Sequence, residues 1–351
     1  MQNDKLYLQH CINLALKGAG NVAPNPMVGC VIVHQNSIIG EGFHAKYGEA
    51  HAEVNAIQSV KDLSLLPEST VYVSLEPCNH YGKTPPCSDL LIKNKIKRVV
   101  IGCVDSFHKV DGKGIEKLKE AGIDVEFNVL EQESRLLNKR FFTVHERNRP
   151  YIILKWAETK NGFISRNLED ITSKEQNWIS GAESKIYTHQ MRANEQAILV
   201  GTQTVKIDNP ELTTREVAGK NPLRMVIDKN LVLKKESKIF NQQANTLIFN
   251  LLKNDAKENI EWIKFEEKAF FKTLFETLVQ KGISSLIVEG GKKTLEEFIA
   301  AGLWDEAFVI RGNTEFESGI NAPLIDGKLI EQKMLGSDQL NLLVNPNNSY
   351  Y

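Results

Sequence analysis

Leu75-Glu-Pro-Cys-Asn-His80 is the stretch that decides the fold of the first half of this 351-residue chain. It places a cysteine behind the β-branched run Thr70-Val-Tyr-Val-Ser-Leu75, which predicts a strand that ends at Pro77. His51-Ala-Glu53 precedes it, and Pro85-Pro-Cys87 follows it. Together the three segments supply one imidazole, two thiols and a carboxylate, and this set of side chains indicates a metal site.

The ligands that we predict are His51, Cys78 and Cys87. Two thiolates and a neutral imidazole suit Zn²⁺ and leave a fourth position for water, which is the pattern of a catalytic zinc site. Glu53, close to the imidazole in sequence, is the predicted general acid/base for that water. An H-x-E segment followed by P-C is the signature of zinc nucleobase deaminases, although eight residues, not two, separate the cysteines here.

Structural zinc and plain burial are the alternative interpretations of these residues, because Cys is among the most buried residue types. The local patterns favour a catalytic site. Cys87 opens the segment Ser88–Ile92, which predicts a helix start, and His51 opens another helical segment over residues 52–60. The unpaired N–H groups of a helix N-terminus lower the pKa of a cysteine there, so this position favours the thiolate.

The composition limits the classes of protein to consider. The length favours two domains, and the content of 42% hydrophobic and 25% charged residues is ordinary for a soluble globular protein. A net charge of −1 gives no overall attraction to nucleic acid or to an anionic membrane. No apolar run reaches the length of a membrane span, and the residues after Met1 lack a signal-peptide core. Five cysteines favour reduced thiols and a cytoplasmic location.

Helical and strand patterns alternate along both halves of the chain, which predicts an α/β fold. We expect two domains, residues 1–146 and 150–345, joined by the charged stretch Glu146–Pro150. Strands are predicted at residues 27–33, 38–43, 70–75, 98–104, 123–129, 151–156, 197–201, 223–228, 246–250, 286–289 and 307–311. Helices are predicted at residues 6–17, 113–121, 130–144, about 174–193, 267–281 and 292–301. A frayed tail is predicted from Asn345.

The chain resembles the bifunctional deaminase/reductase family of riboflavin biosynthesis over nearly its full length. In the first half the resemblance rests on Pro24-Asn-Pro-Met-Val-Gly29, Gly42-Phe-His44, His51-Ala-Glu53 and the segment from Leu75 to Cys87, including its long spacing between cysteines. It implies a cytidine-deaminase-like, three-layer domain with His51, Cys78 and Cys87 as zinc ligands and Glu53 as proton shuttle. The implied reaction is hydrolytic deamination of 2,5-diamino-6-(5-phosphoribosylamino)pyrimidin-4-one. Asn25, His44 and His80 are expected substrate contacts; a turn former and surface histidines are the alternatives.

The second half resembles the same family in segments that carry a reductase. These are Leu154-Lys-Trp-Ala157, Trp178-Ile-Ser180, Met191-Arg192, Ala197–Gly201, Thr204, Asp208-Asn-Pro210, Leu212-Thr-Thr-Arg215 and Val288-Glu-Gly-Gly291. The resemblance implies a dihydrofolate-reductase-like domain that uses NADPH to reduce the ribosyl group to ribityl. It assigns the cofactor to Ala157, Trp178, Thr204, Asp208 and Gly291, and the substrate to Arg192, Leu212, Arg215 and Glu289.

The residues themselves agree with this assignment but do not require it. The donor fork of an Arg suits a phosphate, although Arg192 and Arg215 could also be solvated surface residues. Gly290-Gly291 joins an apolar strand to a helix and would let a phosphate approach the N–H groups there, but such glycines often only turn the chain. The family often has Asp-Gly where this chain has Asn161-Gly162; Asn tolerates the same turn, but the carboxylate is lost, and with it any catalytic role that needs one. Gln196 likewise replaces a common acidic residue.

Two other hypotheses remain open from the sequence alone. A deaminase of free nucleosides or tRNA could carry an unrelated second domain; the tRNA version predicts a basic face that the charge balance does not indicate. A zinc-stabilised binding module would close the fourth ligand position and leave Glu53 without a role. The family resemblance implies a homo-oligomer that acts on a small phosphorylated pyrimidine, without nucleic acid or membrane.

Overall fold

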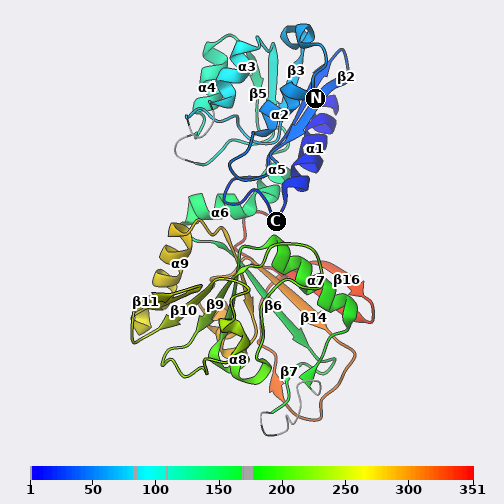
Figure 1. The fold of residues 1–351 in the computed structure, drawn as a ribbon. Coiled ribbons are helices and arrows are strands. Elements are labelled where there is room, and N and C mark those ends of the chain that lie inside the picture. Colours follow the sequence, from blue (N-terminus) through cyan, green and yellow to red (C-terminus); the bar gives the residue numbers. More distant parts are fainter. Residues whose placement is uncertain (1, 82–84, 108–109, 168, 170–176) are drawn as a thin grey trace. The chain divides into compact units, whose positions relative to one another are not determined.

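The structure is a computed structural model and describes residues 2–81, 85–107, 110–167, 169 and 177–351 (Figure 1). The chain divides into two compact units. The first comprises residues 1–149 with Tyr350, and the second comprises residues 150–349 with Tyr351. Among the described residues, no helix has both the length and the apolar character needed to cross a membrane.

The first unit is built on a five-stranded mixed sheet with the order β2-β1-β3-β4-β5. Its strands are β1 (Gly29–His34), β2 (Ser37–Phe43), β3 (Thr70–Val73), β4 (Arg98–Ile101) and β5 (Asp124–Glu126). β1 pairs antiparallel with β2 and β3, whereas β3, β4 and β5 run parallel. Gln35 and Asn36 form the turn between β1 and β2 with positive φ angles of 46° and 64°, as a tight hairpin requires.

Helices cover both faces of this sheet. They are α1 (Gln2–Ala15), α2 (Ala52–Ser59), α3 (Cys87–Lys93), α4 (Lys113–Glu120), α5 (Glu131–Leu137) and α6 (Lys139–Arg147). Cys30 and Ile32 of β1 share one buried core with residues of α2, α3 and α4. Val31 and Val33 point to the opposite face and pack with residues of α1 and α5. Because successive strand residues alternate between the faces, the unit has the predicted three layers.

The second unit contains a ten-stranded mixed sheet with the order β11-β12-β10-β9-β8-β13-β6-β14-β17-β16. Its strands are β6 (Tyr151–Glu158), β8 (Ala197–Gly201), β9 (Leu223–Ile227), β10 (Thr246–Asn250), β11 (Asp255–Lys257), β12 (Ile260–Lys264), β13 (Ser285–Glu289), β14 (Glu306–Arg311), β16 (Lys328–Leu335) and β17 (Asp338–Val344). The run from β12 to β14 is parallel, and the outer strands β11, β17 and β16 are antiparallel to their neighbours. A separate pair joins β7 (Phe163–Ser165) and β15 (Ile320–Asn321).

The connections in the second unit carry four α-helices in the part of the chain that the structure describes. These are α7 (Ala182–Asn194), α8 (Thr202–Asp208), α9 (Phe270–Gln280) and α10 (Lys292–Ala300). The core combines the apolar sides of α9 and α10 with buried residues of β6, β8, β9, β10 and β13. Both units are therefore α/β, as the alternating sequence patterns predict.

Two sequence expectations about helix boundaries are wrong. The helix predicted over residues 130–144 is interrupted at Asn138, whose side chain accepts a hydrogen bond from Met27 N at 2.8 Å and donates one to Met27 O at 2.9 Å. The helix predicted from residue 174 begins at Ala182; residues 174–176 lie outside the described residues, and Asp338 accepts hydrogen bonds from Gly181 N and Ser184 Oγ at the helix start. Distant partners thus set both boundaries.

The expected frayed tail is ordered at Asn345 and Asn348, both of which are buried. Asn345 Nδ2 donates to Trp304 O at 2.9 Å, and Asn348 Nδ2 donates to Asp305 O at 3.0 Å. The tail sequence is polar because these amides satisfy backbone carbonyls inside the second unit, not because it is solvated. The sequence analysis also missed α8 and the strands β7, β11, β12, β15, β16 and β17.

Candidate active sites

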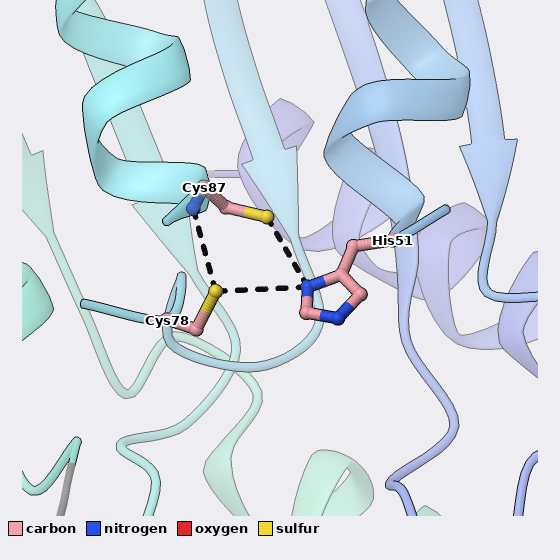
Figure 2. A group of neighbouring side chains, drawn as sticks. All are labelled: His51, Cys78 and Cys87. Carbon is pink, nitrogen blue, oxygen red and sulfur yellow. Dashed lines mark hydrogen bonds between the residues drawn. The ribbon is translucent and has the colours of Figure 1, made fainter. Parts of the chain in front are cut away.

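The three predicted metal ligands meet at the ends of separate elements of the first unit (Figure 2). His51 lies at the N-cap of α2, Cys87 is the first residue of α3, and Cys78 lies in the loop between β3 and α3. His51 Nδ1 is 3.6 Å from Cys78 Sγ and 3.3 Å from Cys87 Sγ. All three ligand atoms lie within 4.8 Å of one another. The three donor atoms therefore surround one point.

The chemistry of this group fits a zinc ion. The Cys87 backbone N–H donates to Cys78 Sγ at 3.3 Å. Hydrogen bonds from the Cys87 thiol and from His51 lower the pKa of the Cys78 thiol to about 4, although burial opposes this. A sulfur that is deprotonated at neutral pH, a second thiol and an imidazole nitrogen form the donor set that Zn²⁺ prefers.

Glu53 is buried beside the triad, with only 3% of its surface exposed. It is the second residue of α2, so the helix that places His51 also places this carboxyl group. Burial raises the pKa of Glu53, and the charge of Cys78 raises it further. A raised pKa makes a carboxylate a stronger base, which favours the proton uptake that a general acid/base requires.

A cavity of about 370 Å³ opens onto these residues, and its wall includes His51, Glu53 and Cys78. Asn25, His44 and His80, the other expected substrate contacts, line the same cavity. His44 Nδ1 lies 3.0 Å from Ala50 O, and a carbonyl can only accept, so this nitrogen carries the proton. His44 Nε2 then accepts a hydrogen bond from Asn25 Nδ2 at 3.2 Å. Burial lowers the pKa of His44, which is consistent with a neutral ring.

His80 and Asp105 add polar groups to the cavity wall. His80 Nδ1 is buried and has no hydrogen-bond partner within the described ranges. Asp105, which the sequence analysis missed, is 6% exposed, and burial raises its pKa to about 7. The one signal in the sequence is that Asp105 follows the carboxyl end of β4, an edge of the sheet where ligands commonly bind.

A second cavity, of about 590 Å³, lies in the second unit. Its lining includes residues at the end of β6, residues of α8 and the end of β13, so it lies at the carboxyl edge of parallel strands. All five expected cofactor residues line it: Ala157, Trp178, Thr204, Asp208 and Gly291. Arg192, Leu212 and Glu289, three of the four expected substrate residues, line it as well. Its volume lies within the usual range for small-molecule and cofactor sites.

A buried ion pair forms part of this wall. Arg192 Nη2 donates to Glu289 Oε2 at 2.7 Å, and each side chain is only 11% exposed. Burial would raise the pKa of Glu289, but Arg192 and Lys155 together hold it at about 2. Lys155 Nζ lies 3.9 Å from Glu289 Oε1 and was also missed by the sequence analysis, which quoted it only within a motif.

Arg215 does not line the large cavity. It lines a neighbouring hollow of about 280 Å³, which shares Arg192 and Leu212 with the large one and also includes Lys238. The backbone N–H of Arg215 donates to Nδ1 of the buried His189 at 3.2 Å. Burial and the charges of Arg192 and Arg215 lower the pKa of His189 to about 4, so its ring is neutral at neutral pH. Three cations and one carboxylate line this hollow, and the excess of positive charge favours an anionic group there.

The glycines after β13 fit closely against α8. Gly290 and Gly291 have positive φ angles of 76° and 72°. A Cβ atom at Gly291 would lie 3.1 Å from Thr204 Oγ1, one of the expected cofactor residues. Residues with side chains would therefore both strain the backbone and crowd Thr204, so the close approach of α8 requires glycine here.

Asn161 and Gln196, the two departures from the family pattern, both make structural contacts. Asn161 Nδ2 donates to Phe316 O at 2.7 Å, and its Oδ1 accepts from Thr159 Oγ1 at 2.8 Å. Gln196 Oε1 accepts from Ser284 N at 2.7 Å, and its Nε2 donates to Gly282 O at 3.2 Å. Each amide uses its N–H donor, which a carboxylate lacks.

Asn161→Asp is therefore expected to destabilise the second unit by about 1–3 kcal/mol, because the Phe316 carbonyl would lose its donor and face a carboxylate oxygen. Chemical unfolding of the full chain, followed by tryptophan fluorescence, measures this. Asn230→Asp makes the same change at an exposed position and is the control. Equal unfolding midpoints for the two variants would contradict the structural role of the amide.

Comparisons with known proteins agree with the two-unit architecture. Residues 1–103 match the cytidine and deoxycytidylate deaminase zinc-binding region, and residues 150–312 match the RibD C-terminal domain. Riboflavin biosynthesis protein RibD of Aquifex aeolicus is 37% identical over 94% of this chain and 93% of its own length. Riboflavin biosynthesis protein RibD of Escherichia coli is 34% identical over 87% of this chain and 86% of its own length.

Solved structures give the same result. A diaminohydroxyphosphoribosylaminopyrimidine deaminase/5-amino-6-(5-phosphoribosylamino)uracil reductase from Thermotoga maritima is 34% identical and superposes with a TM-score of 0.87, covering 97% of this chain and 98% of that one. RibD of Acinetobacter baumannii is 31% identical with a TM-score of 0.87, covering 98% and 99%.

The fold and the two sites define a bifunctional enzyme, with a deaminase unit of the cytidine deaminase type followed by a reductase unit. The similarity extends over most of the length of the relatives. The chain belongs to the RibD family of riboflavin biosynthesis. The expectation of a bifunctional deaminase and reductase is confirmed, and the hypotheses of an unrelated second domain and of a binding module without turnover are not supported.

Proposed function

We propose that residues 1–146 deaminate 2,5-diamino-6-(5-phosphoribosylamino)pyrimidin-4-one with a zinc ion, and that residues 150–345 then use NADPH to reduce the ribosyl group to ribityl. The observation that carries the proposal is the meeting of His51, Cys78 and Cys87 with the buried Glu53 at one cavity. The names of the Thermotoga maritima protein describe a deaminase and a reductase of the same kind.

In the deaminase unit, His51, Cys78 and Cys87 would hold the zinc ion. When bound, zinc lowers the pKa of a water molecule so that it can attack the ring carbon that bears the amino group. Glu53 would take a proton from the attacking water on its carboxylate and would deliver it to the departing amino group.

Two further groups of the deaminase cavity are suited to hold the polar edges of the pyrimidine. Asn25 has its Nδ2 fixed by neutral His44. His80 has a buried Nδ1 that lacks a partner within the described ranges. Both side chains can therefore offer hydrogen bonds to a ring that enters the cavity.

In the reductase unit, Ala157, Trp178, Thr204, Asp208 and Gly291 would hold NADPH, which supplies the hydride. Arg192, Leu212, Arg215 and Glu289 would hold the substrate, with the cations of the smaller hollow beside its phosphate. The carboxylate of Glu289 is ionised and fixed by Arg192, so it can accept hydrogen bonds from sugar hydroxyl groups. We further propose that the enzyme works in the cytoplasm as a homo-oligomer and binds no nucleic acid.

The test is to assay the pure protein with the diaminopyrimidine substrate, with and without NADPH. Ammonia release without NADPH, and oxidation of NADPH only after deamination, would support the proposed order of reactions. NADPH oxidation with the undeaminated substrate at the same rate would contradict the order. If neither reaction occurred, the proposed substrate would be contradicted.

The zinc assignment leads to a separate prediction. Cys78→Ser is expected to reduce the zinc content from about one ion per chain to well below that, because the variant loses one of three protein ligands. Elemental analysis of the pure protein gives the result. Cys103→Ser is the control, because Cys103 is buried and lies outside the triad. Zinc retained at full stoichiometry by Cys78→Ser would contradict the ligand assignment.

A further inference from the structure

Glu76 belongs to the Leu75-Glu-Pro-Cys-Asn-His80 segment, but neither proposed reaction uses it. Its side chain is buried, with 4% of the residue surface exposed. Oε1 accepts from the backbone N–H groups of Gly114 at 2.9 Å and Ile115 at 3.3 Å. Oε2 accepts from those of Asp105 at 3.2 Å and Gly112 at 3.1 Å. Four backbone donors from outside the segment thus converge on one carboxylate.

Three of these donors belong to the N-terminus of α4. Gly112 is the N-cap, with a φ angle of 83°, and it has no side chain with which to cap the helix. The first N–H groups of a helix have no partner inside it, and the helix dipole favours a negative charge there. Glu76 therefore supplies the cap that α4 lacks, and it does so from the segment that carries Cys78.

The start of α4 also contacts the residues that follow Glu76 in the sequence. A Cβ atom at Gly114 would overlap Pro77 O. Pro77 therefore packs against α4 at a distance that only glycine at position 114 permits. Asn79 Nδ2 donates to Lys113 O at 3.2 Å. The residues immediately before and after Cys78 are thus both fixed to the first turn of α4. We call Glu76, Asn79 and Gly114 the α4 clamp.

We propose that Glu76 is a positioning residue for the metal centre: through the α4 clamp, it holds the Cys78 loop where Cys78 Sγ meets His51 and Cys87. The inference rests on the proposed function, since it assumes that zinc binds at the triad. Cys87 and His51 start helices and have their own support, whereas Cys78 lies in a loop. The loop ligand is therefore the one that most needs support from outside.

The alternative is that Glu76 only stabilises the fold. The two roles predict different zinc affinities and zinc release rates for a variant that is still folded. Residues behind the metal ligands typically contribute about 10–100-fold to metal affinity. A purely structural carboxylate would change the stability of the unit but leave the rate at which zinc leaves the folded protein unchanged.

The experiment measures zinc release from the full-length, zinc-loaded protein to a chromogenic chelator, for Glu76→Gln and Gly114→Ala. The first variant would point an amide N–H₂ group at two of the backbone donors. The second would push Pro77 away with its added methyl group, which would also crowd Glu76 Oε1, but it keeps the carboxylate as the cap.

Glu116→Gln is the matched control, because Glu116 lies in the first turn of the same helix but is exposed. We expect both test variants to release zinc about 10–100-fold faster than the control. Reductase activity should not change.

Each outcome bears on one proposal. Release rates equal to the control in folded Glu76→Gln and Gly114→Ala would overturn the positioning role. Failure of both variants to fold, judged by circular dichroism, would also overturn it and leave Glu76 a structural residue. If instead the unsubstituted protein binds no zinc, or Cys78→Ser retains it, the proposed metal centre itself fails.

Discussion

Glu53→Gln is expected to slow deamination by about 10²–10⁴-fold, the usual contribution of a general acid/base. The amide is nearly the same size as the carboxyl group but cannot carry a proton between the attacking water and the leaving group. Glu53 is not one of the three residues that surround the metal position, so the zinc content should stay at about one ion per chain. Ammonia release under saturating substrate measures the effect.

Two controls make this result specific. Glu49→Gln removes the same charge from an exposed residue that lines the same cavity, and it should cost much less activity. Reductase turnover on substrate that has already been deaminated reports on the second unit and should not change. Near-normal deamination by Glu53→Gln would exclude the proton-transfer role, whereas loss of zinc would show that the carboxyl group supports the metal site instead.

Arg192→Met is expected to lower the free energy of unfolding of the second unit by about 3–5 kcal/mol and to abolish measurable reduction. Removing one partner of a buried ion pair leaves the other charge without compensation, and this costs more than the pair contributes when intact. The charge left behind is that of Glu289, whose low pKa depends on Arg192 and Lys155 together and which would keep only the longer contact to Lys155 at 3.9 Å. Chemical unfolding and NADPH oxidation give the two readouts.

The double variant Arg192→Met/Glu289→Gln separates stability from function. With the charges of Arg192 and Glu289 removed, only part of the lost stability should return, because the largely buried Lys155 loses its partner Glu289. Reduction should remain absent because the substrate phosphate and hydroxyl groups have lost their partners. Lys185→Met is the matched control: it breaks the exposed pair with Glu216 on the same helix as Arg192 and should cost only about 0–1 kcal/mol. If Arg192→Met were as stable as this control, the ion pair would contribute far less than its burial implies.

The sequence was most informative where short segments carry reactive side chains. His51, Cys78 and Cys87 could be predicted as a cluster because each lies at a recognisable helix start or just after a strand end, and such ends meet at one edge of a sheet. Asp105 and Lys155 could not be found in this way. Asp105 acquires its raised pKa from burial in the folded unit, and Lys155 stands out only because Glu289, from a distant part of the chain, lies nearby.

The predicted boundaries of two helices were wrong for a related reason. The pattern of residues 130–144 is helical throughout, but Asn138 is used to bind the backbone of Met27, and the helix breaks there. The start of α7 depends on Asp338, which lies far along the chain. Local propensity could not reveal either partner, because both contacts exist only after the unit has folded.

The position of β13 in the second sheet has a consequence for biosynthesis. β13 pairs with β6 on one side and β8 on the other, yet it comprises residues 285–289 and is therefore made long after both. Until the ribosome has released it, β6 and β8 present unpaired edges, and such edges invite pairing with other chains. The reductase cavity, which needs Glu289 to Gly291, can form only when this late strand enters the middle of the sheet. We therefore expect the reductase unit to fold after synthesis and as a whole, and chaperones to matter more for it than for the deaminase unit, whose five strands are complete by residue 126.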